Sequence, residues 1–228
     1  MSKYTISDIH GCSKSFKALL KKIDLSKKDE LYLLGDYVDR GPDSKGVIDH
    51  IWCLQEAGYQ VHCLRGNHED KMLSSCKSGK DMQEWLYWGG RQTLGSFSVQ
   101  TGNEVPIKYQ DWIDGLPFYF EVDNYILVHA GLNFEVRDPM NDEESMMWMR
   151  GYYHTINYEW LKERIIVHGH TPVSKAEIGS LRTDIKKNQY INIDNGCYYD
   201  RPGQGNLCCF SLNDRTLTFQ KNIDRYVS

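Results

Sequence analysis

Five predicted strands of this chain each end in a short segment that carries Asp, His or Asn beside a glycine. These segments are Asp8-Ile9-His10-Gly11, Gly35-Asp36-Tyr37-Val38-Asp39-Arg40-Gly41, Gly66-Asn67-His68-Glu69, His129-Ala130-Gly131 and His168-Gly169-His170-Thr171. Glycine lets the backbone turn sharply and approach a ligand closely. Because ligands of open α/β sheets bind beyond the carboxyl ends of the strands, these segments predict one shared site.

The first half of the chain alternates between strand and helix patterns. We predict strands at Lys3–Ile9, Glu30–Leu34 and Tyr59–Leu64, and helices at Ser13–Ile23 and Asp43–Ala57. Both predicted helices place their apolar residues at helical spacing. This rhythm is typical of βαβ units with parallel strands.

The second half reads mostly as strands, after a segment rich in Trp and Gly. The predicted strands are Phe118–Val122, Tyr125–His129, Ile165–His168, Tyr190–Ile193, Leu207–Leu212 and Thr216–Gln220. We therefore predict an α/β or α+β fold with two layered β-sheets sandwiched by helices. The chain is expected to form a single domain over residues 1–228, with a helical insert at about 69–117 that walls the site.

Composition narrows the class of protein. About 40% of the 228 residues are hydrophobic, enough for a sizeable core. The 27 basic and 31 acidic side chains give a net charge of −4, which does not suggest a general nucleic-acid binder. The seven cysteines form no CxxC pair, so a zinc–thiolate site is not expected. No apolar run has the length of a signal peptide or membrane helix, so a soluble cytoplasmic protein is expected, without a membrane partner.

The strand-end residues supply carboxylate, imidazole and carboxamide groups without thiolate. This mixed set suits Mn, Fe, Zn or Mg. Two divalent ions about 3.5–4 Å apart can share one carboxylate and activate a water molecule. An arginine nearby can bind phosphate through two hydrogen bonds, and a histidine held by a carboxylate can protonate a leaving alcohol.

With these segments in their order along the chain, the sequence resembles the PPP-type serine/threonine phosphatases, and especially their short bacterial and phage members, such as the lambda-phage phosphatase. The resemblance spans most of the chain and implies a fold of paired central sheets with helices outside. It also implies six ligands for two divalent ions: Asp8, His10, Asp36, Asn67, His129 and His170. Asp8, His10 and Asp36 would hold the first ion, and Asp36 would bridge it to the second. We expect Mn, with Fe or Zn as alternatives.

The resemblance further implies catalytic and phosphate-binding residues. His68 would be the general acid, oriented by Asp39, and Arg40 would bind the substrate phosphate. Arg150, in Trp148-Met149-Arg150, fits a second phosphate arginine, although it could also be the charged end of a helix. The sequence departs from the family at Ser7, where the family often has Gly.

A second departure lies in the predicted insert. Trp88-Gly89-Gly90 stands where bacterial members often carry Asn-Gly-Gly, so the substrate entrance is expected to differ. The aromatic residues Trp85, Tyr87 and Trp88 could pack in the core or insert, or could stack a nucleobase. We favour packing.

Several histidines fall outside the implied ligand set. His168 shares its segment with His170, and spacing alone does not choose between them; the resemblance selects His170 as the ligand and leaves His168 for packing. His50, His62 and His154 lie outside every segment and are expected to be structural or exposed.

Three functions are compatible with the sequence. The first is a serine/threonine protein phosphatase in which a hydroxide bridging two metals attacks the phosphorus of a phosphomonoester. The alternative is a symmetrical bis(5′-nucleosyl)-tetraphosphatase, which would hydrolyse diadenosine tetraphosphate. A distant third is an inactive metal-binding scaffold. The expected partner is a phosphoprotein or a phosphorylated small molecule.

Overall fold

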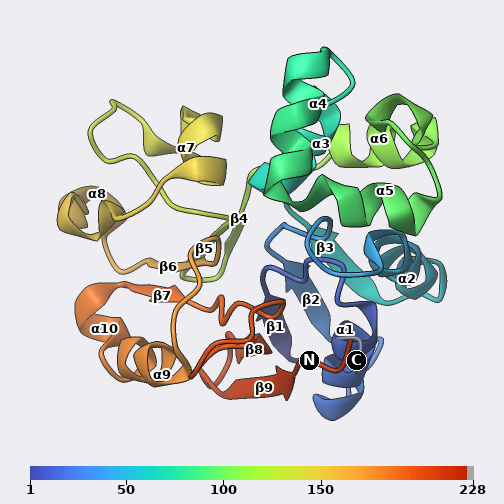
Figure 1. Cartoon of the computed structure of the whole chain (residues 1–228). Coiled ribbons are helices and arrows are strands. Elements are labelled where there is room, and N and C mark those ends of the chain that lie inside the picture. The colour runs from blue at the N-terminus through green and yellow to red at the C-terminus, as the bar shows by residue number, and fades with distance from the viewer. Residues whose placement is uncertain (225–228) are drawn as a thin grey trace.

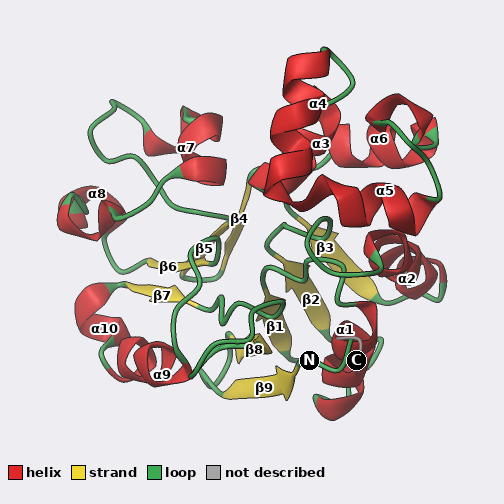
Figure 2. Cartoon of the chain, in the orientation of Figure 1, coloured by secondary structure: helices red, strands yellow, loops and turns green. Residues whose placement is uncertain are grey.

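Two mixed β-sheets form the centre of the molecule (Figures 1 and 2). The computed structural model describes residues 1–224. In the first sheet the strand order is β3-β2-β1-β8-β9. Its strands are β1 (Lys3–Ile6), β2 (Glu30–Leu33), β3 (Gln60–Cys63), β8 (Asn206–Ser211) and β9 (Leu217–Lys221). Strands β1, β2 and β3 are parallel, while β8 runs antiparallel to β1 and β9.

The second sheet has the order β4-β5-β6-β7. Its strands are β4 (Tyr119–Val122), β5 (Tyr125–Val128), β6 (Ile165–His168) and β7 (Tyr190–Asn192). Strands β5, β6 and β7 are parallel, and β4 pairs antiparallel with β5. Each sheet therefore has three neighbouring parallel strands whose carboxyl ends lie along one edge.

The alternation of side chains along the strands builds the layers. Leu31 and Leu33 of β2 pack with helices α1 (Ser13–Lys22) and α2 (Ser44–Glu56). Tyr32, between them, points to the opposite face and joins the core that the two sheets share. Because successive residues of a strand face opposite sides, a strand that is apolar throughout is buried on both faces.

The second sheet is covered on its outer face by short helices. These are α7 (Glu143–Trp148) and α8 (Tyr158–Leu161), which pack on alternate residues of β5 and β6. Helices α9 (Lys175–Thr183) and α10 (Ile185–Asn188) close the shared core from below in Figure 1. The expected fold of two layered sheets with flanking helices is confirmed.

Helices occupy the segment between β3 and β4, grouped at the upper right of Figure 1. They are α3 (Asn67–Ser74), α4 (Gly79–Trp85), a π-helical turn (Leu86–Gly90), α5 (Arg91–Phe97) and α6 (Ile107–Asp114). We place these helices in an insert at about 69–117 of one domain; that assignment stays a prediction. None of the helices within residues 1–224 combines the length and the apolar character needed to cross a bilayer.

Several strands are shorter than predicted at their carboxyl ends. The first strand ends at Ile6 rather than Ile9, and β5 ends at Val128 rather than His129. Asp8 and His10 adopt positive φ angles of 49° and 47°, which no strand accommodates. The apolar pattern continues through Ile9, so the sequence pattern alone cannot show where pairing stops.

The shared core makes a clear stability prediction. Phe210 of β8 is fully buried between the sheets, so Phe210→Ala should lower the free energy of unfolding by about 3–5 kcal/mol. Urea denaturation followed by circular dichroism measures this change. Ile107 is 66% exposed, and Ile107→Ala should alter the same quantity by less than about 0.5 kcal/mol. Equal losses in the two variants would contradict this assignment of the core.

Candidate active site

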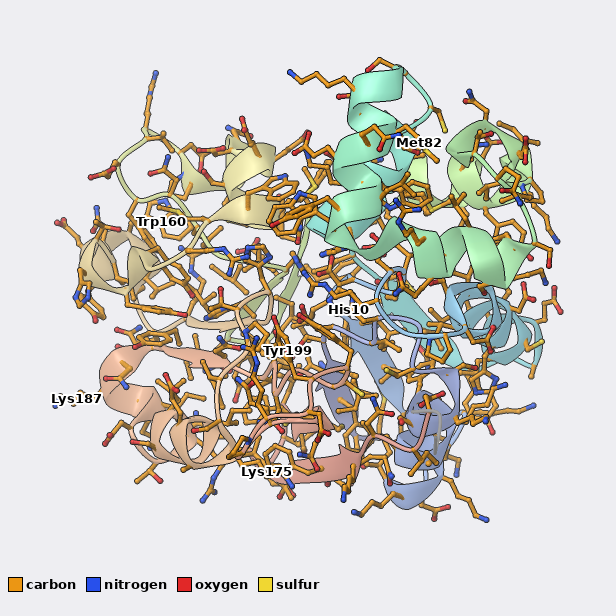
Figure 3. All side chains as sticks on the ribbon, in the orientation of Figure 1. His10, Met82, Trp160, Lys175, Lys187 and Tyr199 are labelled. Atoms are coloured by element: carbon orange, nitrogen blue, oxygen red, sulfur yellow. The ribbon has the colours of Figure 1, made fainter. Side chains whose placement is uncertain are left out.

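The structure brings the segments that follow five strands, β1, β2, β3, β5 and β6, to one place. Figure 3 shows His10 near the middle of the molecule, where the two sheets meet. Nearly all of the predicted site residues are buried, and several have backbone conformations that non-glycine residues rarely adopt. Those with φ between 47° and 70° are Asp8, His10, Asp36, Asp39, Arg40 and His170. Such strain clusters at functional sites, where the surrounding structure enforces it.

Two histidine rings are fixed by backbone carbonyl groups. His10 Nδ1 lies 2.9 Å from the Val38 carbonyl oxygen, and His129 Nδ1 lies 2.8 Å from that of Leu34. Each Nδ1 must therefore carry the proton and donate it, which leaves Nε2 with a free lone pair. Metal-binding histidines are usually oriented in this way by a hydrogen bond from the other ring nitrogen.

One group of candidate ligands crowds lone pairs together. His129 Nε2 lies 2.9 Å from Asn67 Oδ1, 3.2 Å from His170 Nδ1 and 3.5 Å from Asp36 Oδ1. Since His129 Nε2 bears no proton, its contact with the Asn67 oxygen joins two acceptors. A cation between them resolves this conflict, and the donor set fits a divalent ion.

A second group lies on the other side of Asp36. His10 Nε2 is 3.4 Å from Asp36 Oδ2, and His68 Nε2 is 4.0 Å from it. Asp36 belongs to both groups, as a bridging ligand must. Asp8 lies beside them and accepts the backbone N–H of His170 at 3.0 Å.

The electrostatics of these groups favour cation binding. Burial raises the pKa of Asp36 to about 7, and the nearby His68 opposes that shift. Burial also lowers the pKa values of His10 and His170, so both rings are neutral near pH 7. Neutral imidazole is the form that binds metals.

His68 and Asp39 form a hydrogen-bonded pair next to this centre. His68 Nδ1 lies 2.7 Å from Asp39 Oδ2. Burial lowers the pKa of His68 to about 4, an effect that Asp36 opposes, and raises the pKa of Asp39 to about 7. Hydrogen bonds from Thr93 and Trp85 oppose the shift at Asp39. His68 Nε2 is buried and has no hydrogen-bond partner within the described chain.

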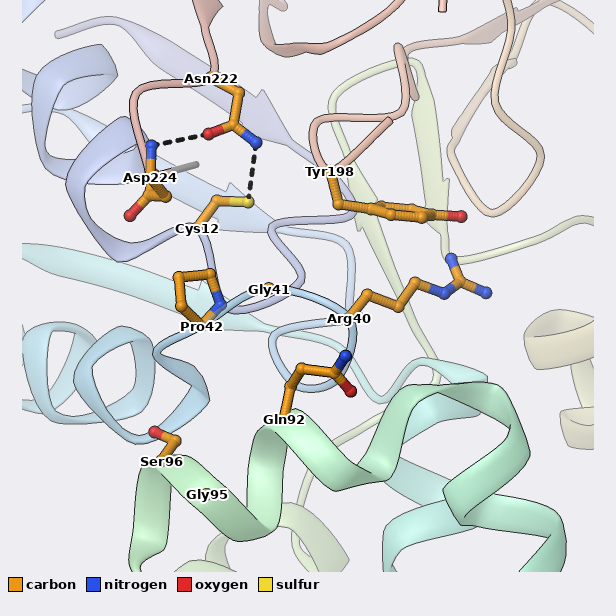
Figure 4. A pocket seen from close by; sticks show the side chains of 10 residues that line it. All are labelled: Cys12, Arg40, Gly41, Pro42, Gln92, Gly95, Ser96, Tyr198, Asn222 and Asp224. Carbon is orange, nitrogen blue, oxygen red and sulfur yellow. Dashed lines mark hydrogen bonds between the residues drawn. The ribbon is translucent and has the colours of Figure 1, made fainter. Parts of the chain in front are cut away.

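Arg40 contacts His10 of the candidate metal centre and also lines an open cavity, which Figure 4 shows. Its Nη1 donates to His10 Nε2 at 2.8 Å, and its guanidinium carbon stacks 4.6 Å from the centre of the Tyr198 ring. Gly89 of the π-helical turn accepts the Arg40 backbone N–H at 3.1 Å. A Cβ atom on Gly89 would lie 2.8 Å from the Arg40 side chain, so this close approach requires glycine.

The cavity beside Arg40 has a volume of about 650 Å³. Pro42 and Tyr198 form part of its wall, and α5 contributes Gly95. Its size falls within the range of about 300–1,000 Å³ that is typical of small-molecule sites.

Arg150 lies on the side of the centre where His170 is, whereas Arg40 contacts His10. It is exposed, and its Nη1 donates to Thr171 Oγ1 at 2.9 Å, next to His170. The preceding helix ends at Trp148, so Arg150 lies beyond the helix rather than at its charged end. Its predicted role as a second phosphate ligand stays a prediction.

Sequence reasoning missed three residues that hold the site together. Glu69 is fully buried and accepts the backbone N–H groups of Asp36, Tyr37, Val38 and Gly66 at 2.7–3.2 Å. Burial raises its pKa to about 8, and these N–H groups oppose the shift. The sequence feature that could have identified Glu69 is its position directly after His68 in the same segment.

The other two missed residues are Trp85 and Thr93, which bind Asp39 from the helical segment. The sequence left nucleobase stacking open for Trp85. The structure excludes it, because the Trp85 ring is fully buried. Tyr87, by contrast, is 85% exposed.

The histidines outside the implied set have other partners. His168 is buried; its Nδ1 donates to the Gly169 carbonyl at 3.1 Å, and its Nε2 accepts from the Tyr153 hydroxyl at 3.3 Å. Burial lowers the pKa of His168 to about 3. His62 stacks on Tyr32, and His50 packs against Phe16. All seven cysteines are free thiols.

With this geometry established, the comparison with known families is decisive. Residues 3–207 match the calcineurin-like phosphoesterases. This chain belongs to that family. The assignment confirms the resemblance to PPP-type metallophosphoesterases, and the family's use of divalent metals agrees with the two candidate ligand groups.

Relatives of this phosphoesterase carry two related names. A symmetrical bis(5′-nucleosyl)-tetraphosphatase from Buchnera aphidicola is 28% identical over 170 residues, which cover 68% of this chain and 57% of the relative. The asymmetrical bis(5′-nucleosyl)-tetraphosphatase PrpE from Oceanobacillus iheyensis is 26% identical and covers 85% of this chain and 83% of its own. The chain thus spans little more than half the length of the symmetrical relative.

Solved structures show the same fold. A protein serine/threonine phosphatase from Saccharomyces cerevisiae, similar to human phosphatase PP5, superposes with a TM-score of 0.69. It is 16% identical, and the match covers 99% of this phosphoesterase and 81% of the yeast chain. At this identity the likeness concerns the fold alone.

The ligand groups lead to a prediction about metal content. Asp36→Asn should abolish binding at both sites, because Asp36 belongs to both ligand groups. Elemental analysis of protein dialysed against Mn²⁺ measures this loss. Asp123→Asn is a matched control, because Asp123 is exposed, pairs with Lys3 and belongs to neither ligand group. This variant should keep the wild-type metal content. A variant at Asp36 that keeps one ion would show that the bridging assignment is wrong.

Proposed function

We propose that this phosphoesterase hydrolyses a phosphoanhydride bond of dinucleoside tetraphosphates such as diadenosine tetraphosphate. The likeness to relatives named as tetraphosphatases carries the proposal, since the PrpE match extends over 85% of the chain. This evidence favours the alternative drawn from the sequence over the protein phosphatase that we expected first.

The cavity beside Arg40 supports a substrate larger than a phosphomonoester. Arg40 lines a space of about 650 Å³, so a phosphate held by its guanidinium group would lie beside that space. We propose that one nucleoside end of the substrate occupies this space, since Tyr198 and Pro42 offer apolar surface and Gln92 and Ser96 offer polar groups.

We assign the chemistry as follows. Two divalent ions, proposed to be Mn²⁺, would be held by the six predicted ligands and would supply an activated water and charge neutralisation. Arg40 and Arg150 bind the phosphate oxygens from opposite edges. His68, oriented by Asp39, protonates the departing oxygen.

A second candidate is the hydrolysis of phosphoserine or phosphothreonine in proteins. The position of Arg150 beside His170 favours it, because two arginines across the centre suit a single terminal phosphate. The two functions would use the same residues and would differ in the group attached to the reacting phosphate, a nucleotide in one case and a protein side chain in the other.

Parallel assays distinguish these functions. Metal-stripped protein is reloaded with Mn²⁺ and tested on diadenosine tetraphosphate, a phosphothreonine peptide and p-nitrophenyl phosphate. We expect metal-dependent cleavage of the dinucleotide, giving two ADP if the cut is symmetrical or ATP and AMP if it is not. Cleavage of the peptide alone would replace this proposal with the second candidate. If the protein binds metal but hydrolyses none of the three substrates, the remaining hypothesis is an inactive metal-binding scaffold.

The cavity can be tested separately by filling it. Gly95 lines the cavity, and a Cβ atom there would meet no atom within 4 Å, so Gly95→Trp fills space without a backbone clash. We expect KM for diadenosine tetraphosphate to rise at least about 10-fold because the indole excludes the nucleoside. Turnover of p-nitrophenyl phosphate should stay within about 2-fold, since it needs only the phosphate site.

Gly179→Trp is the matched control, because Gly179 is another helical glycine with open space around its Cβ position. It should leave both activities unchanged. If Gly95→Trp binds the dinucleotide as tightly as wild type, the nucleoside does not occupy this cavity.

A further inference from the structure

The carboxylate of Asp39 is held by two donors from the helical segment between β3 and β4. Trp85 Nε1 lies 3.0 Å from both Asp39 oxygens, and Thr93 Oγ1 lies 2.6 Å from Asp39 Oδ1. The other oxygen, Oδ2, binds His68 Nδ1 at 2.7 Å. The side chains of Trp85, Thr93 and His68 therefore all donate hydrogen bonds to this carboxylate.

The direction of the Thr93 hydrogen bonds follows from the count of protons. Its hydroxyl has one proton, and Asp39 Oδ1 is an ionisable acceptor at 2.6 Å. Thr93 Oγ1 also accepts the Asp39 backbone N–H at 2.8 Å. Because the only hydroxyl proton of Thr93 is donated to Asp39, Ser44 Oγ, which lies 2.9 Å from Thr93 Oγ1, must donate to Thr93. Thr93 thus fixes both the backbone and the side chain of Asp39.

Because the Asp39 carboxylate is buried, its hydrogen bonds from Trp85 and Thr93 cannot be replaced by hydrogen bonds from solvent. Asp39, Trp85 and Thr93 are all inaccessible to solvent, so water cannot replace a lost donor. A buried carboxylate that loses a donor reorients toward whatever donors remain. Any rotation of Asp39 carries the His68 ring with it, because Nδ1 has no other side-chain partner in residues 1–224.

We propose that Trp85 and Thr93 are positioning residues that aim His68 Nε2 at the departing oxygen of the substrate. This inference rests on the proposed function, in which His68 is the proton donor. His68 acts in this step as an imidazolium with one proton on each ring nitrogen, and Nδ1 keeps its proton on Asp39. As the bond from phosphorus to the leaving oxygen breaks, its electron pair stays on that oxygen, which takes the proton from Nε2. The oxygen of the entering water completes the phosphate, the proton that this water loses restores the imidazolium, and Asp39 remains a carboxylate throughout.

The proposal predicts a dependence on the leaving group. Phenolate is a poor leaving group and needs the proton in the transition state, whereas p-nitrophenolate departs largely without it. Loss of the positioning contacts should therefore slow phenyl phosphate hydrolysis much more than p-nitrophenyl phosphate hydrolysis. A general loss of folding or of metal would slow both equally.

Thr93→Val removes the hydroxyl with little change in shape, and Thr93→Ser restores it. For Thr93→Val we expect kcat on phenyl phosphate to fall about 10–100-fold, and kcat on p-nitrophenyl phosphate by less than about 3-fold. KM and Mn²⁺ content should match wild type, and Thr93→Ser should recover most of the rate. Trp85→Phe should show the same pattern.

Thr5→Val is the matched control. Thr5 is also a buried threonine, and its hydroxyl binds the Phe210 carbonyl at 3.1 Å in the first sheet. This variant loses a buried hydroxyl without touching Asp39, so both substrates should be hydrolysed at wild-type rates. Equal losses on both substrates at Thr93, or no rescue by serine, would overturn the proposal.

A spectroscopic measurement tests the geometry without turnover. The proton NMR signal of His68 Nδ1–H, assigned by its absence in His68→Gln, can be followed in Zn²⁺-loaded protein. It should shift and broaden in Thr93→Val and Trp85→Phe but not in Thr5→Val. An unchanged signal would overturn the positioning role, even if the proposed phosphoesterase activity is found. Wild-type inactivity with a signal that responds as expected would instead count against the function alone.

Discussion

The carboxylate of Glu69 is the interaction on which the site depends. It accepts four backbone N–H groups from the segments that follow β2 and β3, and so fixes the two strand ends relative to each other. Asp36 and Asn67 lie in those same segments, and both lie close to His129 Nε2. No side chain of the site could be placed accurately if these backbones moved independently.

The gathering of the proposed ligands at one place could be predicted from sequence, because each of them follows a strand within a few residues. Parallel strands bring those positions to one edge, so local segments were enough to place Asp8, Asp36, Asn67 and His129 together. The supports of Asp39 could not be found in this way. Trp85 and Thr93 lie 46 and 54 residues away along the chain, in helices whose apolar pattern gives no sign of a polar contact.

Substrate preference was the second property that the sequence motifs did not predict. The strand-end segments are compatible with both functions considered from the sequence, so they do not separate a protein substrate from a dinucleotide. Three parts of the structure lie beside Arg40 and outside those segments: the π-helical turn, the cavity wall to which α5 contributes, and the loop that carries Tyr198. Their shape depends on packing between distant segments, which is why the relatives rather than the motifs favoured the dinucleotide.

The left-handed backbone at the strand ends has a consequence for how such a protein evolves. Asp39 and Arg40 are consecutive residues with φ near 70°, a conformation that glycine adopts freely and that other residues adopt at a cost of about 1–3 kcal/mol each. The same strain recurs at Asp8, His10, Asp36 and His170. Glycine at any of these positions would relieve the backbone strain but would remove a functional side chain. Six of the twelve non-glycine residues with positive φ in the described chain lie at the site. Selection for heat resistance can therefore relieve such strain at the other six positions, but at these six only by giving up a functional side chain.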